Sequence, residues 1–400
     1  MFTNLRYSNN LTKVFVLTLL SLLVAMSQPT SYAGELVGWG YNYAGVTDVP
    51  EGDDFVAISA AAYHNLALRA DGTVVAWGAD YYGEGVVPDG LTDVVAIAAG
   101  TYHNLAVRAD GTVVAWGRNQ YGETTVPDGL SDVVAVAAKD GWGSLALKAD
   151  GSMVAWGGYT MTPTGNDFVA ITAGGYVMLG LRADGSLEDT YPYYVTPEGE
   201  SLSILHPEGN DFVAIAAAYS HVLAAKADGT VVAWGVNTYG ETVVPDGLSD
   251  VVAVAAGGSG PWGGGHSLAL KADGTVVGWG YNVDGQTVVP ARNDFVGIAA
   301  GTFHSLAIID TSVEAKLENL INDVEAINFE NGISNSLIKK LDNALAACLA
   351  ENADQRQDAI NKMEAFINSV EAQQGKKISD ADADYLVAAA EAIILQLLEI

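Results

Sequence analysis

One phrase recurs along most of this 400-residue chain. Residues 64–78 read HNLALRADGTVVAWG, residues 103–117 read HNLAVRADGTVVAWG, and looser copies follow. Each copy has apolar arms joined by Asp-Gly, a pair that indicates a hairpin whose two turn residues can take positive φ. The pair begins at Asp71, Asp110, Asp150, Asp184, Asp228 and Asp273, at spacings of 39, 40, 34, 44 and 45 residues. Periods near 40, with about four short strands each, are typical of propeller blades.

The arms of the repeat predict how many blades there are and how they close. First arms begin near Phe55, Val94, Val133, Phe168, Phe212, Val251 and Phe295, and second arms carry Trp39, Trp77, Trp116, Trp156, Trp234 and Trp279, with Thr190 at a seventh register. Residues 35–40 are a second arm without a first, and residues 295–310 are a first arm without a second. If the N-terminal strand completes the last blade, no sheet edge stays open. We therefore predict a mainly β, seven-bladed β-propeller closed by the N-terminal strand.

The residues after Asp310 follow a different pattern, with an apolar period of 3.6. Four amphipathic segments, at 312–327, 334–352, 354–373 and 379–400, predict a small all-α helical bundle. Ser379 stands where a helix cap is expected, three residues before Asp382.

The N-terminal residues have the order of a secretory signal. Arg6 and Lys13 precede a 13-residue apolar run, and Ser-Tyr-Ala precedes Gly34. The run is too short to span a bilayer. The predicted domains are therefore a signal peptide over 1–33, cleaved near Ala33, a propeller over 34–310 and a four-helix domain over 311–400. The mature protein is expected to be secreted, periplasmic or held at the cell surface, without a membrane span.

Composition excludes one class of partner. The chain has 18 Lys and Arg against 48 Asp and Glu, a net charge of −30, and loss of Arg6 and Lys13 with the signal would make it −32. Affinity for nucleic acid depends on neutralising phosphates with basic residues, so nucleic acid is not expected as a partner. Cys348 is the single cysteine, which excludes an internal disulfide, and it is interpreted as a small buried apolar residue.

The repeat also resembles a known one. WGYNVDGQTVVP at 279–290, its relatives at 116 and 234, and the HSLALKADGTV core resemble the repeat of the regulator-of-chromosome-condensation superfamily over residues 35–310. The short repeat length points within it to the secreted bacterial seven-bladed β-lactamase inhibitory proteins, and this resemblance implies inhibition of a β-lactamase. Blades four and five depart from the pattern. The C-terminal segment, through AFINSVEAQQGKKIS, resembles the FIMAH domain.

Aromatic residues collect in the loops of one predicted face. Because antiparallel strands alternate in direction, the loops before HNLAL and after Trp-Gly leave the propeller on the same side. All 15 tyrosines between Gly34 and Asp310 fall in these loops, where Tyr offers a large contact area at little entropic cost. The alternative is that these rings only cap the blades. The predicted partner-binding residues are Tyr63, Tyr82, Tyr102, Tyr121, Trp142, Tyr176, Tyr191, Tyr193, Tyr219, Tyr239, Trp262, Tyr281 and Phe303.

The remaining polar motifs favour structural roles. The opposite face is acidic, but turn chemistry explains its Asp-Gly residues, and calcium is the alternative. Five histidines, His64, His103, His221, His266 and His304, share one repeat position, which indicates scaffold residues. No nucleophile elbow, phosphate loop or zinc spacing occurs, so we predict no catalytic residue, no cofactor and no metal.

Three classes of function follow. The first is a monomeric, secreted protein-binding propeller, with an extracellular or periplasmic enzyme such as a β-lactamase as the most specific partner. The alternative is a carbohydrate-binding or adhesion module that stacks glycans on the same rings. A propeller enzyme is disfavoured. One continuous aromatic patch would favour a protein partner, and one shallow pocket per blade would favour sugars.

Overall fold

A computed structural model describes residues 33–139, 142–158, 161–175, 177–189, 193–195, 201–203, 206–258, 264–327, 329, 332–348 and 353–399. The chain divides into two compact units, one up to Ile309 and one from Asp310. Residues 1–32 of the predicted signal peptide lie outside the described residues.

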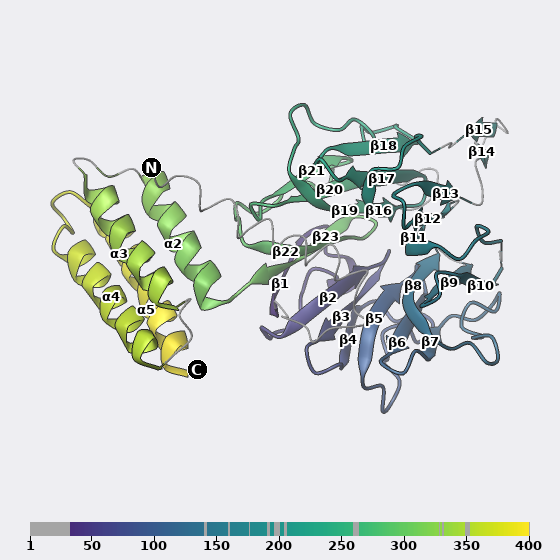
Figure 1. Ribbon diagram of the computed structural model, residues 1–400, viewed down its shortest axis with the longest axis horizontal. Coiled ribbons are helices and arrows are strands. Elements are labelled where there is room, and N and C mark those ends of the chain that lie inside the picture. Colours follow the sequence, from purple (N-terminus) through teal and green to yellow (C-terminus); the bar gives the residue numbers. More distant parts are fainter. Residues whose placement is uncertain are drawn as a thin grey trace. The chain divides into compact units, whose positions relative to one another are not determined.

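The first unit consists of small antiparallel sheets that follow one another around a common centre (Figure 1). The strands are β1 (Gly34–Gly40), β2 (Phe55–Ala60), β3 (His64–Arg69), β4 (Val74–Gly78), β5 (Val94–Ala99), β6 (His103–Arg108), β7 (Val113–Gly117), β8 (Val133–Lys139), β9 (Gly143–Lys148), β10 (Met153–Gly157), β11 (Phe168–Ala173), β12 (Met178–Arg182), β13 (Leu187–Asp189), β14 (Tyr193–Val195), β15 (Ser201–Ser203), β16 (Phe212–Ala217), β17 (His221–Lys226), β18 (Val231–Gly235), β19 (Val251–Gly257), β20 (His266–Lys271), β21 (Val276–Gly280), β22 (Phe295–Ala300) and β23 (His304–Asp310). A short 3-10 turn, η1 (Tyr43–Gly45), follows β1.

The strand starts match the sequence prediction, because the first strand of each repeat begins at the predicted residue, from Phe55 to Phe295. The expected number of strands per repeat was wrong, since the complete repeats form three hydrogen-bonded strands in the described residues and not about four. β1 lies between β23 and β2 in a sheet ordered β22-β23-β1-β2-β3-β4. The hairpin β14-β15 is an addition to the repeat.

The core lies between neighbouring sheets. The middle strand β3 is buried along its length, and its side chains alternate between two clusters as the strand period requires. Leu66 and Leu68 pack with Trp116 of the following repeat, whereas Ala67 packs on the other side with Phe55 and Ile308. Burial of one leucine side chain contributes about 1.5–3 kcal/mol to the free energy of folding. Because β3 is covered on both faces, it holds the neighbouring sheets together.

The Asp-Gly turns differ from the expected type. Gly72 N donates to Arg69 O (3.0 Å) and Arg69 N to Thr73 O (2.9 Å), which makes a three-residue loop. Gly72 has φ +81°, but Asp71 is not among the residues with positive φ, so the expectation that both would be was wrong. The Asp71 carboxylate instead accepts Thr73 N (2.9 Å) and Thr73 Oγ1 (2.7 Å), a local bond that stabilises the loop without positive φ at Asp71.

The second unit is helical. It contains α2 (Val313–Ile327), α3 (Ile333–Cys348), α4 (Ala353–Glu371) and α5 (Asp380–Glu399), which confirms the four predicted helices. Leu317, Leu341, Phe366 and Leu386 are fully buried in its core. Asp382 N donates to Ser379 Oγ (3.1 Å), so the predicted cap of the last helix is present.

Cys348 is partly buried against this core, and its burial raises the pKa of the thiol to about 11. The thiol is therefore protonated and unreactive at neutral pH. Among the described helices, none combines the length and the apolar character that a membrane span needs.

Candidate functional site

The two sets of loops that carry the aromatic residues leave the propeller at the same end. Ala79 N, just after β4, donates to Tyr63 O, just before β3, and Arg118 N donates to Tyr102 O, each over 2.8 Å. The register agrees, because His64 pairs with Gly78. Loops before the middle strand and loops after the third strand are therefore direct neighbours.

Aromatic rings in these loops contact one another from repeat to repeat. The centroids of Tyr43 and Tyr63 are 5.8 Å apart, those of Tyr63 and Tyr102 are 6.1 Å apart, and those of Tyr82 and Tyr102 are 5.2 Å apart. Each such pair stabilises the fold by about 0.5–1.5 kcal/mol in addition to the free energy gained by burying its surface. We call the connected set the aromatic row; its members are Tyr41, Tyr43, Tyr63, Tyr81, Tyr82, Tyr102, Tyr121, Trp142, Tyr239, Tyr281 and Phe303.

Arg118 continues the row between two repeats. Its Cζ lies 5.0 Å from the Tyr102 centroid, 5.5 Å from that of Tyr121 and 6.0 Å from that of Tyr82. Tyr121 in turn contacts Trp142, with centroids 5.8 Å apart. The guanidinium therefore links Tyr121 to the Tyr82–Tyr102 pair, and cation–π attraction stabilises this arrangement.

The other end of the row contains Tyr239, Tyr281 and Phe303. Tyr239 and Tyr281 are 4.9 Å apart, and Tyr281 and Phe303 are 6.3 Å apart. Phe303 O accepts a hydrogen bond from Tyr41 N (2.9 Å), which places it beside the first rings. The row thus passes from the last repeat to the first.

An open hollow of about 450 Å³ lies where the rings of the last repeat meet those of the first. Its lining residues are Tyr41, Tyr43, Val46, Ala62, Tyr63, Tyr81, Tyr102, Phe303 and His304. The hydroxyls of Tyr43 and Tyr81 share a hydrogen bond of 2.7 Å, and this bond raises the pKa of Tyr81 to about 12. The Tyr81 hydroxyl is therefore neutral at physiological pH.

The structure brings together eight of the predicted residues, namely Tyr63, Tyr82, Tyr102, Tyr121, Trp142, Tyr239, Tyr281 and Phe303. Tyr219 is half-buried and lies over Gly175, where an added Cβ would meet its ring at 2.3 Å. The statement that all tyrosines fall in loops was wrong for Tyr193 and Tyr194, which lie in β14, a hairpin that the repeat pattern does not include. Tyr176, Tyr191 and Trp262 lie outside the described residues.

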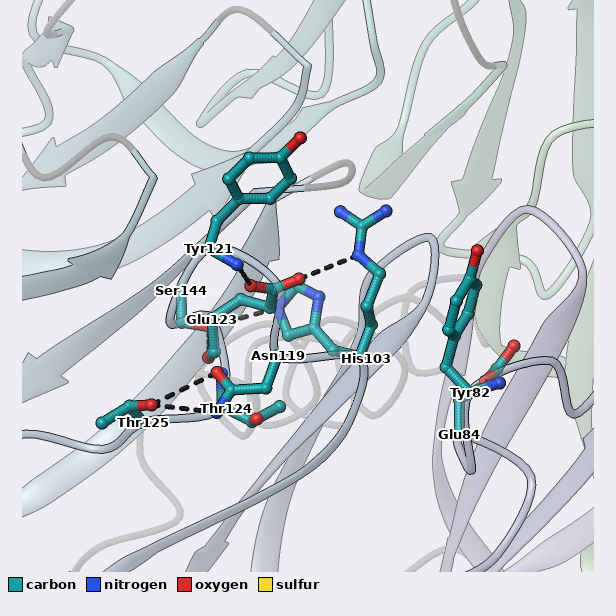
Figure 2. Close-up of polar contacts among 10 residues, drawn as sticks. Tyr82, Glu84, His103, Asn119, Tyr121, Glu123, Thr124, Thr125 and Ser144 are labelled. Carbon is teal, nitrogen blue, oxygen red and sulfur yellow. Dashed lines mark hydrogen bonds and ion pairs between the residues drawn. The ribbon is translucent and has the colours of Figure 1, made fainter.

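A buried carboxylate or amide beneath four of these loops was missed by the sequence analysis. Glu123 is fully buried and accepts Tyr121 N (2.6 Å) and Arg118 Nε (2.9 Å), while Asn119 accepts Thr124 N (3.1 Å) in the same turn (Figure 2). Burial opposes the charge on Glu123, but these hydrogen bonds outweigh it and lower its pKa. Glu84, Glu241 and Gln286 hold the same turn in other repeats. Their shared position in YGE and DGQ was the available signal.

The five repeated histidines are structural, as predicted. His64 Nε2 donates to Asn104 Oδ1 (2.6 Å), and Asn104 Nδ2 donates to Glu84 O (2.7 Å), which fixes the direction of both bonds. His103 contacts Ser144 in the same way at 3.1 Å. Each histidine thus joins its own sheet to the next one.

Burial keeps these histidines neutral. It lowers the pKa of His103 and His221 to about 4, and that of His266 and His304 to about 3. On the other side of the propeller, hydrogen bonds from Thr73 lower the pKa of Asp71. The parts of the chain that the structure describes contain no group of three or more His, Cys, Asp or Glu arranged to hold a metal ion.

Family comparisons agree with this architecture. Residues 55–84, 94–123, 212–241 and 251–286 match the Regulator of chromosome condensation (RCC1) repeat, and residues 315–395 match the FIMAH domain. The first unit is an RCC1-like repeat propeller. The sequence as a whole has no significant match among curated proteins.

Solved structures show the same fold at low identity. Prp20p from Saccharomyces cerevisiae, described with its binding to Gsp1p and histones, is 16% identical with a TM-score of 0.57 over 72% of this chain and 94% of that one. Human WBSCR16 is 16% identical with a TM-score of 0.54, and the match covers 70% of this chain and 99% of WBSCR16. The ectodomain of receptor kinase CR4 from Physcomitrella patens is 23% identical with a TM-score of 0.51, and the match covers 64% of this chain and 71% of the ectodomain chain.

Proposed function

We propose that this chain is a protein-binding propeller whose aromatic row contacts the surface of a protein partner. The connectivity of the row carries the proposal. Its rings extend over the loops of several repeats as one connected surface, whereas sugar binding by the same repeats would favour one shallow pocket in each. Tyr81, Tyr82 and Trp142 are about half exposed, at 53%, 54% and 46%, so part of each side chain is accessible to a partner. Interfaces concentrate their energy in such aromatic anchors.

The fold comparison supports the same class of function. Prp20p is described as binding Gsp1p and histones, and a second structure shows Kap60 bound to it. Protein binding is thus a known use of this fold, although the loops that select a partner differ. The resemblance noted in the sequence suggests an extracellular or periplasmic enzyme, with β-lactamase inhibition as the most specific case. We therefore propose a secreted monomeric binder, cleaved near Ala33.

We also propose that the propeller has seven blades and is closed by β1. The supports are the place of β1 between β23 and β2, and the contact between β2 and β22 that completes the sequence of neighbouring sheets. Closure places Tyr41 and Tyr43, which follow β1, beside Tyr63 of the first complete repeat.

The experiment compares two variants of the full chain. In the first, Tyr82→Ser, Tyr121→Ser and Trp142→Ala remove exposed members of the row. In the second, Val243→Ser and Val288→Ser remove apolar side chains that are 60% and 63% exposed outside it. Two readouts are measured: binding to a partner captured from the host's secreted proteins, and inhibition of a β-lactamase that hydrolyses a chromogenic substrate. The first variant should lose the binding or inhibition that the wild type shows, and the second variant should keep it.

The carbohydrate alternative has its own outcome in this design. A glycan array that gives saturable binding, lost in the same aromatic variant, together with no protein partner, would replace the proposal with an adhesion function. Equal protein binding by both variants would show that the aromatic row is not the interface.

A further inference from the structure

The hollow where the rings of the last repeat meet those of the first offers a more specific inference. We propose that this hollow receives the guanidinium of an arginine side chain from the protein partner. The inference deepens the proposed function and rests on it. Three features of the molecule support it: the orientation of the rings, the contact of the row with the chain's own Arg118, and the negative charge of the chain.

The rings of the hollow stand at steep angles to one another. Tyr43 and Tyr81 are inclined to Tyr63 by 66° and 84°, whereas Tyr41 is nearly parallel to Tyr43, at 15°. The hydrogen bond between the hydroxyls of Tyr43 and Tyr81 holds these two rings in place. Walls built from aromatic rings in several orientations are the arrangement that surrounds a cation, because the face of each ring is electronegative.

Arg118 provides an internal example of the same recognition. Its guanidinium lies within 5.0–6.0 Å of three tyrosine rings of the row, including Tyr102, which also lines the hollow. A planar guanidinium therefore fits between tyrosines on this face. Arginine suits such a site better than lysine, since it stacks on rings and is less strongly hydrated.

The charge of the surroundings favours a positive occupant. The residues that line the hollow include neither Lys nor Arg, and His304 among them is neutral at physiological pH. Arg118, which contacts Tyr102, is paired with the Glu123 carboxylate. Two carboxylates stand near the rings in the sequence. Asp80 directly precedes Tyr81, and Asp48, which follows η1, accepts a hydrogen bond from Asn42 Nδ2 at 2.8 Å. The chain as a whole has a net charge of −30, which attracts basic surfaces.

The test uses two small probes of nearly the same shape, one with a charged guanidinium and one with a neutral urea group. N-acetyl-arginine amide and its neutral counterpart N-acetyl-citrulline amide are titrated into the full chain, and binding is followed by tyrosine side-chain NMR signals. The arginine probe is expected to bind roughly fivefold or more tightly than the citrulline probe. Equal binding of the two probes, or no saturable shift with arginine, would overturn the inference.

Variants locate the probe. Tyr43→Leu and Tyr81→Leu change exposed rings, so both proteins should fold, and each should weaken arginine binding severalfold. Tyr81→Phe keeps the ring but removes its hydrogen bond to Tyr43, so it should weaken arginine binding less than Tyr81→Leu does. Tyr385→Leu is the matched control, because Tyr385 is a similarly exposed tyrosine of the helical unit, outside the aromatic row, and it should leave arginine binding unchanged. Equal losses in Tyr385→Leu and Tyr43→Leu would contradict the assignment.

The two proposals fail in different ways. If a protein partner binds the chain and Tyr43→Leu or an excess of the arginine probe leaves that complex intact, the hollow is not the arginine site, while the proposed function stands. If the probes discriminate as expected but the variant that lacks Tyr82, Tyr121 and Trp142 binds the partner normally, the proposed interface fails.

Discussion

His304 Nε2 donates a hydrogen bond to Asn65 Oδ1 over 2.7 Å, across 239 positions of the sequence. The same two positions are joined one repeat later, where His64 contacts Asn104 at 2.6 Å. Asn65 also donates to Val46 O (2.9 Å), which fixes the orientation of its amide. The contact that links neighbouring sheets elsewhere therefore also links the last repeat to the first.

Replacement of Asn65 by Leu should destabilise the propeller. The change leaves the buried His304 N–H without its acceptor, and it removes one of two donors to Val46 O, the other being Trp77 Nε1. A buried donor without a partner costs about 1–3 kcal/mol. Urea unfolding measures the loss, with Val283→Ser, at a 76% exposed residue, as the control. An unfolding free energy equal to that of the wild type would show that this bond contributes nothing.

Deletion of residues 34–42 should lower the melting temperature of the whole propeller. Leu36 and Trp39 of this segment are buried, and Trp39 Nε1 donates to Gln286 O (2.9 Å). Loss of two buried apolar side chains costs several kcal/mol at about 1.5–3 kcal/mol each. Circular dichroism follows the melting, with a chain that begins at Gly34 as the reference. The same melting temperature in both would refute closure by β1.

Trp142→Ala should weaken partner binding by about 2 kcal/mol or more and leave the unfolding midpoint almost unchanged. Trp142 is 46% exposed and contacts Tyr121, so its truncation removes contact area without opening the core. The same prediction holds for Trp262, which lies outside the described residues. Calorimetric titration and thermal melting measure the two effects. Normal binding combined with early melting would make the aromatic face a cover over the scaffold.

Glu123→Gln should cost less stability than Glu123→Ala, which should cost about 1–3 kcal/mol. Glutamine keeps an acceptor for Tyr121 N, but its single amide oxygen cannot also accept Arg118 Nε. Gln286 occupies the equivalent position in another repeat, where its Oε1 accepts Asp284 N at 3.1 Å. An amide can therefore hold this turn, but alanine leaves Tyr121 N and the Arg118 guanidinium without the acceptor they share. Urea unfolding compares the variants, and a Gln variant as unstable as the Ala variant would contradict the equivalence.

Stability should fall as the pH drops below about 6.5. Histidine in the unfolded chain has its ordinary pKa of 6.5, while the folded values are about 4 for His103 and His221 and about 3 for His266 and His304. Below pH 6.5 the unfolded state binds more protons, so the histidine contribution is complete above 6.5 and is lost toward pH 4 to 3. Urea unfolding at pH 7.5, 6.0 and 5.0 measures this slope, and a free energy that stays constant or rises at pH 5.0 would contradict it.

The repeat by itself determined the arrangement of strands. Asp-Gly pairs, Trp-Gly pairs and alternating apolar residues recur at fixed positions, so the start of each first strand could be placed from Phe55 to Phe295. The helical unit was equally readable, because the apolar period changes after Asp310 and Ser379 marks a cap. Periodicity reports which side of an element is buried, and that information is local.

Only the tertiary structure decided which loop residues meet. Arg118 lies over the rings of Tyr82 and Tyr121, which belong to two different repeats, and no periodic pattern predicts that contact. The role of Glu123 was hidden for the same reason, since a glutamate in a Gly-rich loop is usually exposed, and only the folded turn aims the N–H of Tyr121 at its carboxylate. Sequence sets the local geometry, whereas contacts between distant loops depend on how the sheets are placed around their common centre.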